Sequence, residues 1–234
     1  MTSTLSVSMT RVCHMLFHRW EYSVVADQVR IIQPDGCRDL ILISRPGKPD
    51  AIRTTDWDNQ PQVVHLQAGT MMVGYRLSPG TTIAPTIQAN EELNSDTLED
   101  MIESEAKRSS EIFELIETLA RSNATVEQVA RQSGRTARTL QRQFRDLALP
   151  SPDFWRLLGR ARRSAKALPC RVSLAEIAYE YGYSDQAHMT REYVRWFGSS
   201  PSRLRQNKGS IVDINQPGLG NWPSEGSSEL GDLF

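Results

Sequence analysis

One pattern occurs twice in the second half of this chain, with an offset of 48 residues. The first copy spans residues 125–134 (TVEQVARQSG) and the second spans residues 173–182 (SLAEIAYEYG). Each copy starts with Thr or Ser, has Gln or Glu three positions later, continues with an apolar stripe that ends in Ala, and closes on Gly. This opening is the capping box that starts a helix, and Gly permits the left-handed turn that ends one. The pattern predicts two short helices, each followed by a tight turn.

A second amphipathic helix is predicted after each copy, over residues 136–145 and 184–197, the latter with Ser184 as its N-cap. The apolar residues expected to face inward are Leu140, Phe144, Met189, Tyr193 and Phe197. Two short helices joined by a Gly turn form a helix-turn-helix unit, whose second helix enters the major groove of DNA. The sequence therefore predicts two DNA-reading units.

The polar residues left on the outward faces of the second helices are candidates for DNA contacts. Arg can bond guanine and Gln can bond adenine with two hydrogen bonds each. Expected base contacts are Arg138, Gln141, Arg142, Gln186, His188 and Arg191. Residues in turns or on the segment between the units are expected to contact phosphates instead. These are Arg135, Thr136, Arg156, Arg160, Arg163 and Ser184.

The segment between the two units predicts one stiff helix. Ser151 is a suitable N-cap and Pro152 suits the first helical position, so we expect a helix over residues 152–168. Such a helix spans roughly 24 Å at 1.5 Å per residue. It could hold the reading helices about one DNA turn, or about 34 Å, apart in successive major grooves.

Charge is unevenly distributed along the chain. Residues 121–208 contain 17 Lys and Arg against 7 Asp and Glu, a net charge of +10, whereas the remaining residues contain 10 against 21, a net charge of −11. A basic segment of this kind is typical of a domain that binds a polyanion.

The first part of the chain predicts a different architecture. Short runs rich in β-branched residues, at 24–32, 40–43, 63–66 and 71–77, are separated by Pro, Gly, Asp and Asn turns. We expect a small antiparallel β domain over residues 1–93, of the sandwich or barrel kind. The fold class is therefore α+β, with an all-α second half.

Residues 94–110 are expected to form a helical linker, and the polar stretch at 103–110 favours two helices or one kinked linker over one continuous coiled coil. The first helix could serve dimerisation, or it could pack on its own β domain. The DNA-binding domain is expected over residues 111–208. Residues 209–234, which are rich in Gly, Ser, Asn, Pro and acidic side chains, are expected to be a disordered tail.

Residues 112–206 resemble the DNA-binding domain of AraC/XylS-family transcription regulators. The resemblance is carried by residues 138–144 (RTLQRQF), by the second copy with its continuation to Tyr193, and by Phe197-Gly198 and Ser200-Pro201. One departure is Met189, where the family often has Phe, and this exchange keeps an apolar side chain of similar bulk. The resemblance implies two helix-turn-helix units on a joining helix and control of transcription at promoter DNA.

Residues 33–41 (QPDGCRDLI) and 74–80 (GYRLSPG) resemble strand and turn segments of cupin-like sensor domains in some of these regulators. The resemblance implies an effector site, although aromatic residues in a small β domain are more often part of the core. The candidates are Trp20, Tyr22, Arg38, Trp57, His65 and Tyr75. Metal binding by Cys13, His14 and His18 is not favoured because no carboxylate supports it, so no metal and no cofactor are expected.

The sequence predicts a cytoplasmic protein without catalytic activity. The three cysteines show no disulfide or zinc spacing, and neither a signal peptide nor a run of about 18 apolar residues is present. Expected partners are double-stranded promoter DNA, with RNA polymerase, a second copy of the chain and an unidentified small effector as candidates. Two alternatives are a regulator that binds another protein instead of a ligand, and a cupin-type enzyme fused to a DNA-binding module.

Overall fold

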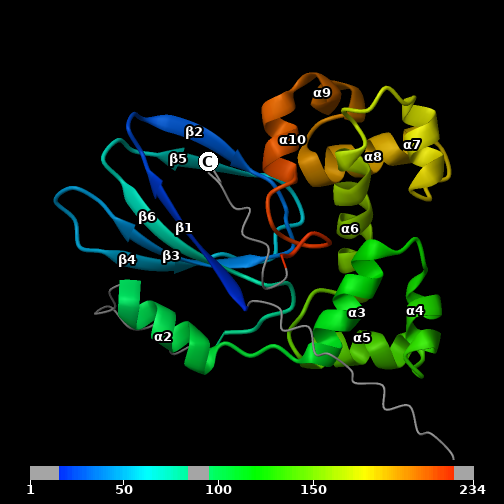
Figure 1. Ribbon diagram of the computed structural model, residues 1–234, viewed down its shortest axis with the longest axis horizontal. Coiled ribbons are helices and arrows are strands. Elements are labelled where there is room, and N and C mark those ends of the chain that lie inside the picture. Colours follow the sequence, from blue (N-terminus) through cyan, green and yellow to red (C-terminus); the bar gives the residue numbers. More distant parts are fainter. Residues whose placement is uncertain (1–15, 84–94, 224–234) are drawn as a thin grey trace, which may run out of the picture.

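The computed structural model describes residues 16–83 and 95–223 and contains a β-sheet part beside a helical part (Figure 1). The strands are β1 (Phe17–Ser23), β2 (Gln28–Ile32), β3 (Arg38–Ser44), β4 (Ala51–Thr54), β5 (Gln62–Leu66) and β6 (Met71–Leu77). The helices are α2 (Ser95–Glu105), α3 (Ser110–Arg121), α4 (Val126–Gln132), α5 (Ala137–Asp146), α6 (Pro152–Lys166), α7 (Leu174–Glu180), α8 (Gln186–Phe197), α9 (Pro201–Gln206) and α10 (Lys208–Ile214). Strands precede helices, so the predicted α+β class is confirmed.

The strands form two antiparallel sheets, a four-stranded sheet of order β1-β6-β3-β4 and a ribbon of β2 and β5. The antiparallel prediction is confirmed, but the run predicted at 24–32 becomes a strand only from Gln28. Val24 instead forms a turn contact, in which its backbone N–H donates to the Thr70 carbonyl at 2.9 Å.

Helix α2 covers one face of the four-stranded sheet. Leu98 and Ile102 are fully buried there, in a cluster with Leu40, Tyr75 and Leu77. Of the two roles considered for this helix, the structure therefore shows packing on its own sheet. A separate helix α3 begins at Ser110, so the predicted interruption of the helical linker is also confirmed.

Helix α6 is the centre of the helical part, with α5 near one end and α8 near the other (Figure 1). Trp155, Leu158, Ala161 and Ala165 are fully buried along it. The predicted inward residues of the second helices, Leu140, Phe144, Met189, Tyr193 and Phe197, are all buried in the same core. Packing around one helix therefore fixes both helix-turn-helix units relative to each other.

Gly159 marks the closest approach between α6 and α3. A Cβ atom at this position would lie 2.5 Å from the Ala120 Cα atom and 2.7 Å from the Ala120 carbonyl oxygen. Both are backbone atoms, so the helices would have to move apart.

We therefore expect Gly159→Ala to destabilise the protein by about 1–3 kcal/mol, the usual range for overpacking. Urea unfolding measures this change, with Gly209→Ala as the control. A Cβ at Gly209 meets only the Asn207 side chain, at 3.5 Å, so this variant should be neutral or slightly stabilising. Equal unfolding midpoints for both variants would contradict the close helix contact.

The prediction of a disordered tail over 209–234 is wrong for the residues that the structure describes there. Helix α10 covers 208–214, and Ile214, Leu219 and Trp222 are buried. The apolar residues in this Gly- and Asn-rich segment are few, but they enter existing cores and so stabilise an ordered path. Residues 224–234 lie outside the described residues.

Candidate nucleic-acid interface

The first helix-turn-helix unit begins with a complete capping box. The Thr125 hydroxyl accepts from the Gln128 N–H at 3.3 Å, and the Gln128 side chain accepts from the Thr125 N–H at 2.8 Å. Gly134 has φ of 70°, the left-handed conformation predicted for the turn. Helix α5 then starts at its N-cap Thr136.

The second unit repeats this geometry. Ser173 and Glu176 form the capping box, with contacts of 2.9 and 3.1 Å, and Gly182 has φ of 74°. The predicted N-cap Ser184 is wrong by one position, because the Asp185 carboxylate accepts from the His188 N–H at 2.6 Å.

The two second helices present rows of exposed polar side chains. Arg138, Gln141 and Arg142 lie on α5 at helical spacing, and Gln186 and Arg191 lie on α8. Within the described ranges, none of these five side chains has a hydrogen bond or an ion pair. Their donors are therefore available to a ligand on that surface.

His188 differs from the other predicted base contacts because it is half-buried and already bonded. Its Nδ1 atom accepts from the Ser184 N–H at 3.3 Å, and its Nε2 atom lies 3.4 Å from a Glu192 carboxylate oxygen. These contacts orient the ring, and they also occupy both of its nitrogens. Ser184, predicted as a phosphate contact, is thus a partner of His188.

Three predicted phosphate contacts lie at or near the surface. Arg135 pairs with Glu111, and Thr136 caps α5. Arg156 is 2.8 Å from the carboxylate of Asp153, which is 53% exposed. Exposed ion pairs are weak, so a phosphate could replace these carboxylate partners.

The other two predicted phosphate contacts donate to groups of the protein itself. Arg160 is buried, donates to the Gly182 carbonyl at 3.1 Å and to Glu192 at 2.7 Å, and lies over the Tyr183 ring. Arg163 donates to the carbonyls of Ala120 and Ser122, at the C-terminal end of α3. These guanidinium groups connect helices of the protein, because backbone carbonyls and a carboxylate take their donors.

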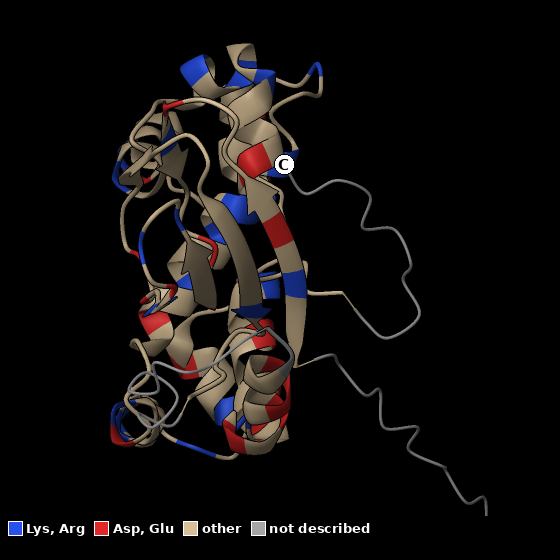
Figure 2. Ribbon diagram, turned by 90° about the vertical axis from the view of Figure 1, so that its left-hand side faces the viewer, with Lys and Arg blue, Asp and Glu red and all other residues tan. Residues whose placement is uncertain are grey.

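The charges in the structure follow the division expected from the sequence. Acidic residues colour much of α2, at the lower end of the molecule in Figure 2. The helix α5, by contrast, has Arg138, Arg142 and Arg145 exposed. The basic segment thus presents its cations on a reading helix.

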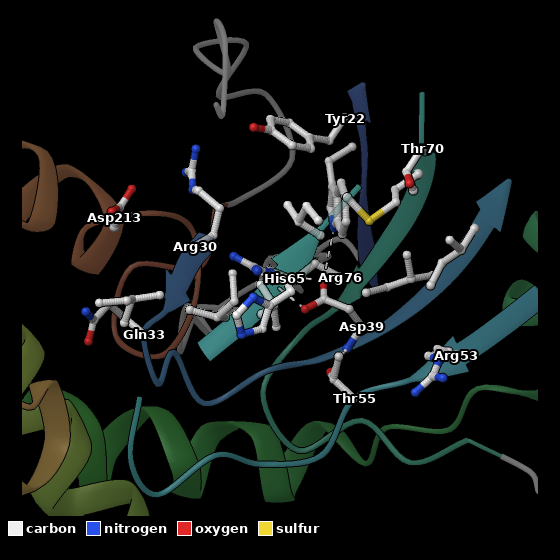
Figure 3. A pocket seen from close by; sticks show the side chains of 18 of the residues that line it. Tyr22, Arg30, Gln33, Asp39, Arg53, Thr55, His65, Thr70, Arg76 and Asp213 are labelled. Atoms are coloured by element: carbon white, nitrogen blue, oxygen red, sulfur yellow. Dashed lines mark hydrogen bonds and ion pairs between the residues drawn. The ribbon is translucent and has the colours of Figure 1, made fainter. Parts of the chain in front are cut away.

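A cavity of about 700 Å³ lies in the β-sheet part and is lined by residues of all six strands (Figure 3). Among the predicted effector residues, Trp20, Tyr22 and His65 line it. Arg38, Trp57 and Tyr75 do not line it. Tyr75 is in the core under α2. The Arg38 guanidinium lies over the Trp57 ring, and the centroid of that ring is 6.3 Å from the Trp155 ring in an edge-to-face arrangement.

Asp39 and Arg76, which are not among the predicted effector residues, form the polar floor of this cavity. They face each other in register on β3 and β6, and their side chains are 3.1 Å apart. The Arg76 guanidinium is also 3.1 Å from the Asp35 carboxylate. Burial alone disfavours its charge, but the two carboxylates hold the pKa of the Arg76 guanidinium above its ordinary value. The Trp20 ring lies against Gly74, and its indole N–H donates to the Asp39 carboxylate at 3.1 Å.

Within residues 16–83 and 95–223, no three His, Cys, Asp or Glu side chains are grouped so that they could hold a metal ion. Of the metal candidates, Cys13 and His14 lie outside these ranges, and His18 is buried against Trp222. The described helices include none that is long and apolar enough to cross a membrane.

The chain is similar to several known proteins. A family model described as a helix-turn-helix domain matches residues 129–207. The probable transcription factor PqrA of Proteus vulgaris is 30% identical over 108 residues, which are 45% of this chain and 88% of that protein. ToxT from Vibrio cholerae is 10% identical with a TM-score of 0.44, over 82% of this chain and 98% of that one. CdpR from Pseudomonas aeruginosa is 23% identical with a TM-score of 0.35, over 60% and 47%.

The paired helix-turn-helix units and the transcription factor relative define a DNA-binding transcription regulator. Within this class, the chain belongs to the AraC/XylS family, so the resemblance found in the sequence is confirmed.

Proposed function

We propose that this regulator binds an asymmetric promoter site, with α5 and α8 in successive major grooves. The observation that carries the proposal is the pair of exposed, unpartnered polar rows held on one central helix. Arg138, Gln141 and Arg142 form one row, while Gln186 and Arg191 form the other. Helix α6 has 15 residues and therefore spans about 22 Å, which suits two reading helices on one face of the duplex. Because the rows differ, the two half-sites should differ.

Selection of bound sequences from a random double-stranded DNA pool tests this proposal. We expect one motif with two unlike blocks, whose centres are about 10 base pairs apart. A palindromic motif, or a single short block, would contradict reading by two unlike helices of one chain.

We also propose that the cavity of the β-sheet part binds a small effector with an apolar body and a negatively charged group. Trp20, Ile41, Ile43, Val64 and Met72 supply apolar lining. The lining cations Arg30, Arg45 and Arg53 have no carboxylate partner among the described residues, whereas Asp35 and Asp39 are both paired with Arg76. A volume of about 700 Å³ is within the usual range for small-molecule sites.

Two dyes that share a ring system test this ligand class. Anilinonaphthalene sulfonate is anionic, and N-phenylnaphthylamine is its neutral counterpart. We expect the anionic dye to bind about tenfold more tightly, because arginine can form charge-assisted hydrogen bonds with the sulfonate. The difference should disappear in Arg30→Gln/Arg53→Gln and persist in Lys48→Gln, which lies outside the cavity lining. Equal binding of both dyes to the unmodified protein would contradict an anion site.

We further propose that the protein acts in the cytoplasm without catalysis or cofactor. A second copy of the chain and RNA polymerase are candidate protein partners, and light scattering of the full chain with and without its selected DNA tests self-association. A constant monomer mass, with one chain per site on DNA, would contradict the dimer.

A further inference from the structure

Residues 208–223 follow the matched helix-turn-helix region and return to the β-sheet part (Figure 1). We call them the strap. Ile211 and Ile214 of α10 pack in the core of the helical part. The strap then crosses to the turn before β3, where the Leu219 N–H donates to the Asp35 carbonyl at 2.8 Å. Trp222 ends the crossing against His18, with ring centroids 4.7 Å apart.

The strap is tied to the joining helix by one buried cation. Arg162 of α6 is 2% exposed and donates to the carbonyls of Gln216 at 2.7 Å and Leu219 at 3.2 Å, and to the Asn221 side chain at 3.1 Å. It also reaches the Pro34 carbonyl, on the β-sheet part, at 3.5 Å. Each of the three nitrogens of this buried guanidinium donates a hydrogen bond, so displacement is resisted, since unpaired donors would be costly. The orientation of α6, and of both reading helices on it, is thereby fixed against the β-sheet part.

The strap also touches the cavity. Asp213 and Gln216 line it, and Asp213 extends from α10 on the side where Arg30 lies (Figure 3). Arg76, in the cavity floor, donates to the Pro217 carbonyl at 3.3 Å and pairs with Asp35. An anion held by Arg30, which has no carboxylate partner among the described residues, would place its charge on the side of the cavity where the Asp213 carboxylate lies. Repulsion between the two negative charges would push α10, and the strap with it, away from the cavity.

We propose that the strap is an autoinhibitory contact, which holds the reading helices in one orientation and is released when an anion bound at Arg30 in the cavity repels the Asp213 carboxylate of α10. The release step rests on the proposed effector function, whereas the restraint itself rests only on the contacts of Arg162 and Leu219.

Gly218→Ala tests the restraint without altering a reading helix. Its Cβ would lie 2.7 Å from the Asp35 carbonyl oxygen, so the crossing should lift off the β-sheet part. Gly209→Ala is the matched control in the same segment. We expect Gly218→Ala to bind the selected DNA at least fivefold more tightly than the unmodified chain, within the usual range of coupling between sites. Gly209→Ala should bind within twofold of the unmodified chain.

Fluorescence anisotropy with labelled DNA measures these affinities, and circular dichroism checks that each variant is folded. If Gly218→Ala is misfolded, Trp222→Ala removes the other end of the crossing and should give the same increase. Unchanged or weaker DNA binding by a folded strap variant would overturn the proposal.

Addition of anilinonaphthalene sulfonate tests the release step. We expect the dye to tighten DNA binding of the unmodified chain and of Gly209→Ala, and to have no further effect on Gly218→Ala. If the dye leaves the unmodified chain unchanged while Gly218→Ala still binds more tightly, control by an anion is contradicted and the restraint stands. If the dye tightens all three proteins equally, the strap does not transmit the signal.

Discussion

Arg138→Ala is expected to weaken binding to the DNA site selected from the random pool by about 5- to 150-fold. This is the range for loss of one contact that makes two hydrogen bonds to guanine. The loss should be confined to one of the two sequence blocks, because Arg138 is on α5 only. Arg191→Ala should relax the other block, because Arg191 is on α8. Repeated selection from the random pool with each variant measures both effects.

Arg145→Ala is the matched control for this experiment. Arg145 is also an exposed arginine of α5, but it lies in the last turn beside Asp146, with 3.8 Å between the charged groups. Its loss should weaken binding to all sequences alike and leave the motif unchanged. If Arg138→Ala and Arg191→Ala both retain the complete motif, the assignment of these residues as base contacts is wrong.

The local structure of the reading units could be predicted because its causes are local. The capping boxes at Thr125 and Ser173 and the left-handed glycines are specified by residues within ten positions of each other. The inward faces of α5 and α8 follow from helical spacing alone. Only the N-cap of α8 was misplaced, because Ser184 and Asp185 are both suitable caps and the choice depends on His188.

The burial of Arg162 could be predicted from the local sequence pattern, but its hydrogen-bond partners could not. Arg162 lies seven positions after Trp155 and four after Leu158, so it is on the apolar stripe of α6, and this position was a signal of burial. Its partners, however, are 54 to 59 residues later, and also in the β-sheet part. No spacing rule identifies such partners, and the strap was for the same reason expected to be disordered.

The cavity could be predicted in part. Trp20, Tyr22 and His65 were selected as large side chains of the β domain, and they line it. Tyr75 has the same chemistry but faces α2, because its side depends on which face of the sheet that helix covers. The Asp39–Arg76 pair depends on the register of β3 and β6, which the sequence does not show directly.

Arg160→Met is expected to lower the free energy of unfolding by about 3 kcal/mol, near the lower end of the range for breaking a buried ion pair. The side chains of Arg160 and Glu192 are only 9% and 13% exposed, so Glu192 would remain buried without its main partner. His188, at 3.4 Å, can compensate in part, which favours the lower end. The Gly182 carbonyl in the second turn would lose its donor as well. Chemical unfolding measures the effect.

Two further variants separate this structural role from the phosphate contact that the sequence predicted. Arg160→Met/Glu192→Leu should recover most of the stability, because an apolar pair can replace a buried ion pair at little cost. Arg156→Met, which breaks an ion pair to an exposed carboxylate, should change stability by less than about 1 kcal/mol.

A phosphate contact would behave in the opposite way: Arg160→Met would leave stability unchanged and reduce the salt dependence of DNA binding by about one unit of slope. Because Arg160 spans from α6 to both the turn and the reading helix of the second unit, we expect the loss of stability, together with a weaker preference in the block that α8 reads.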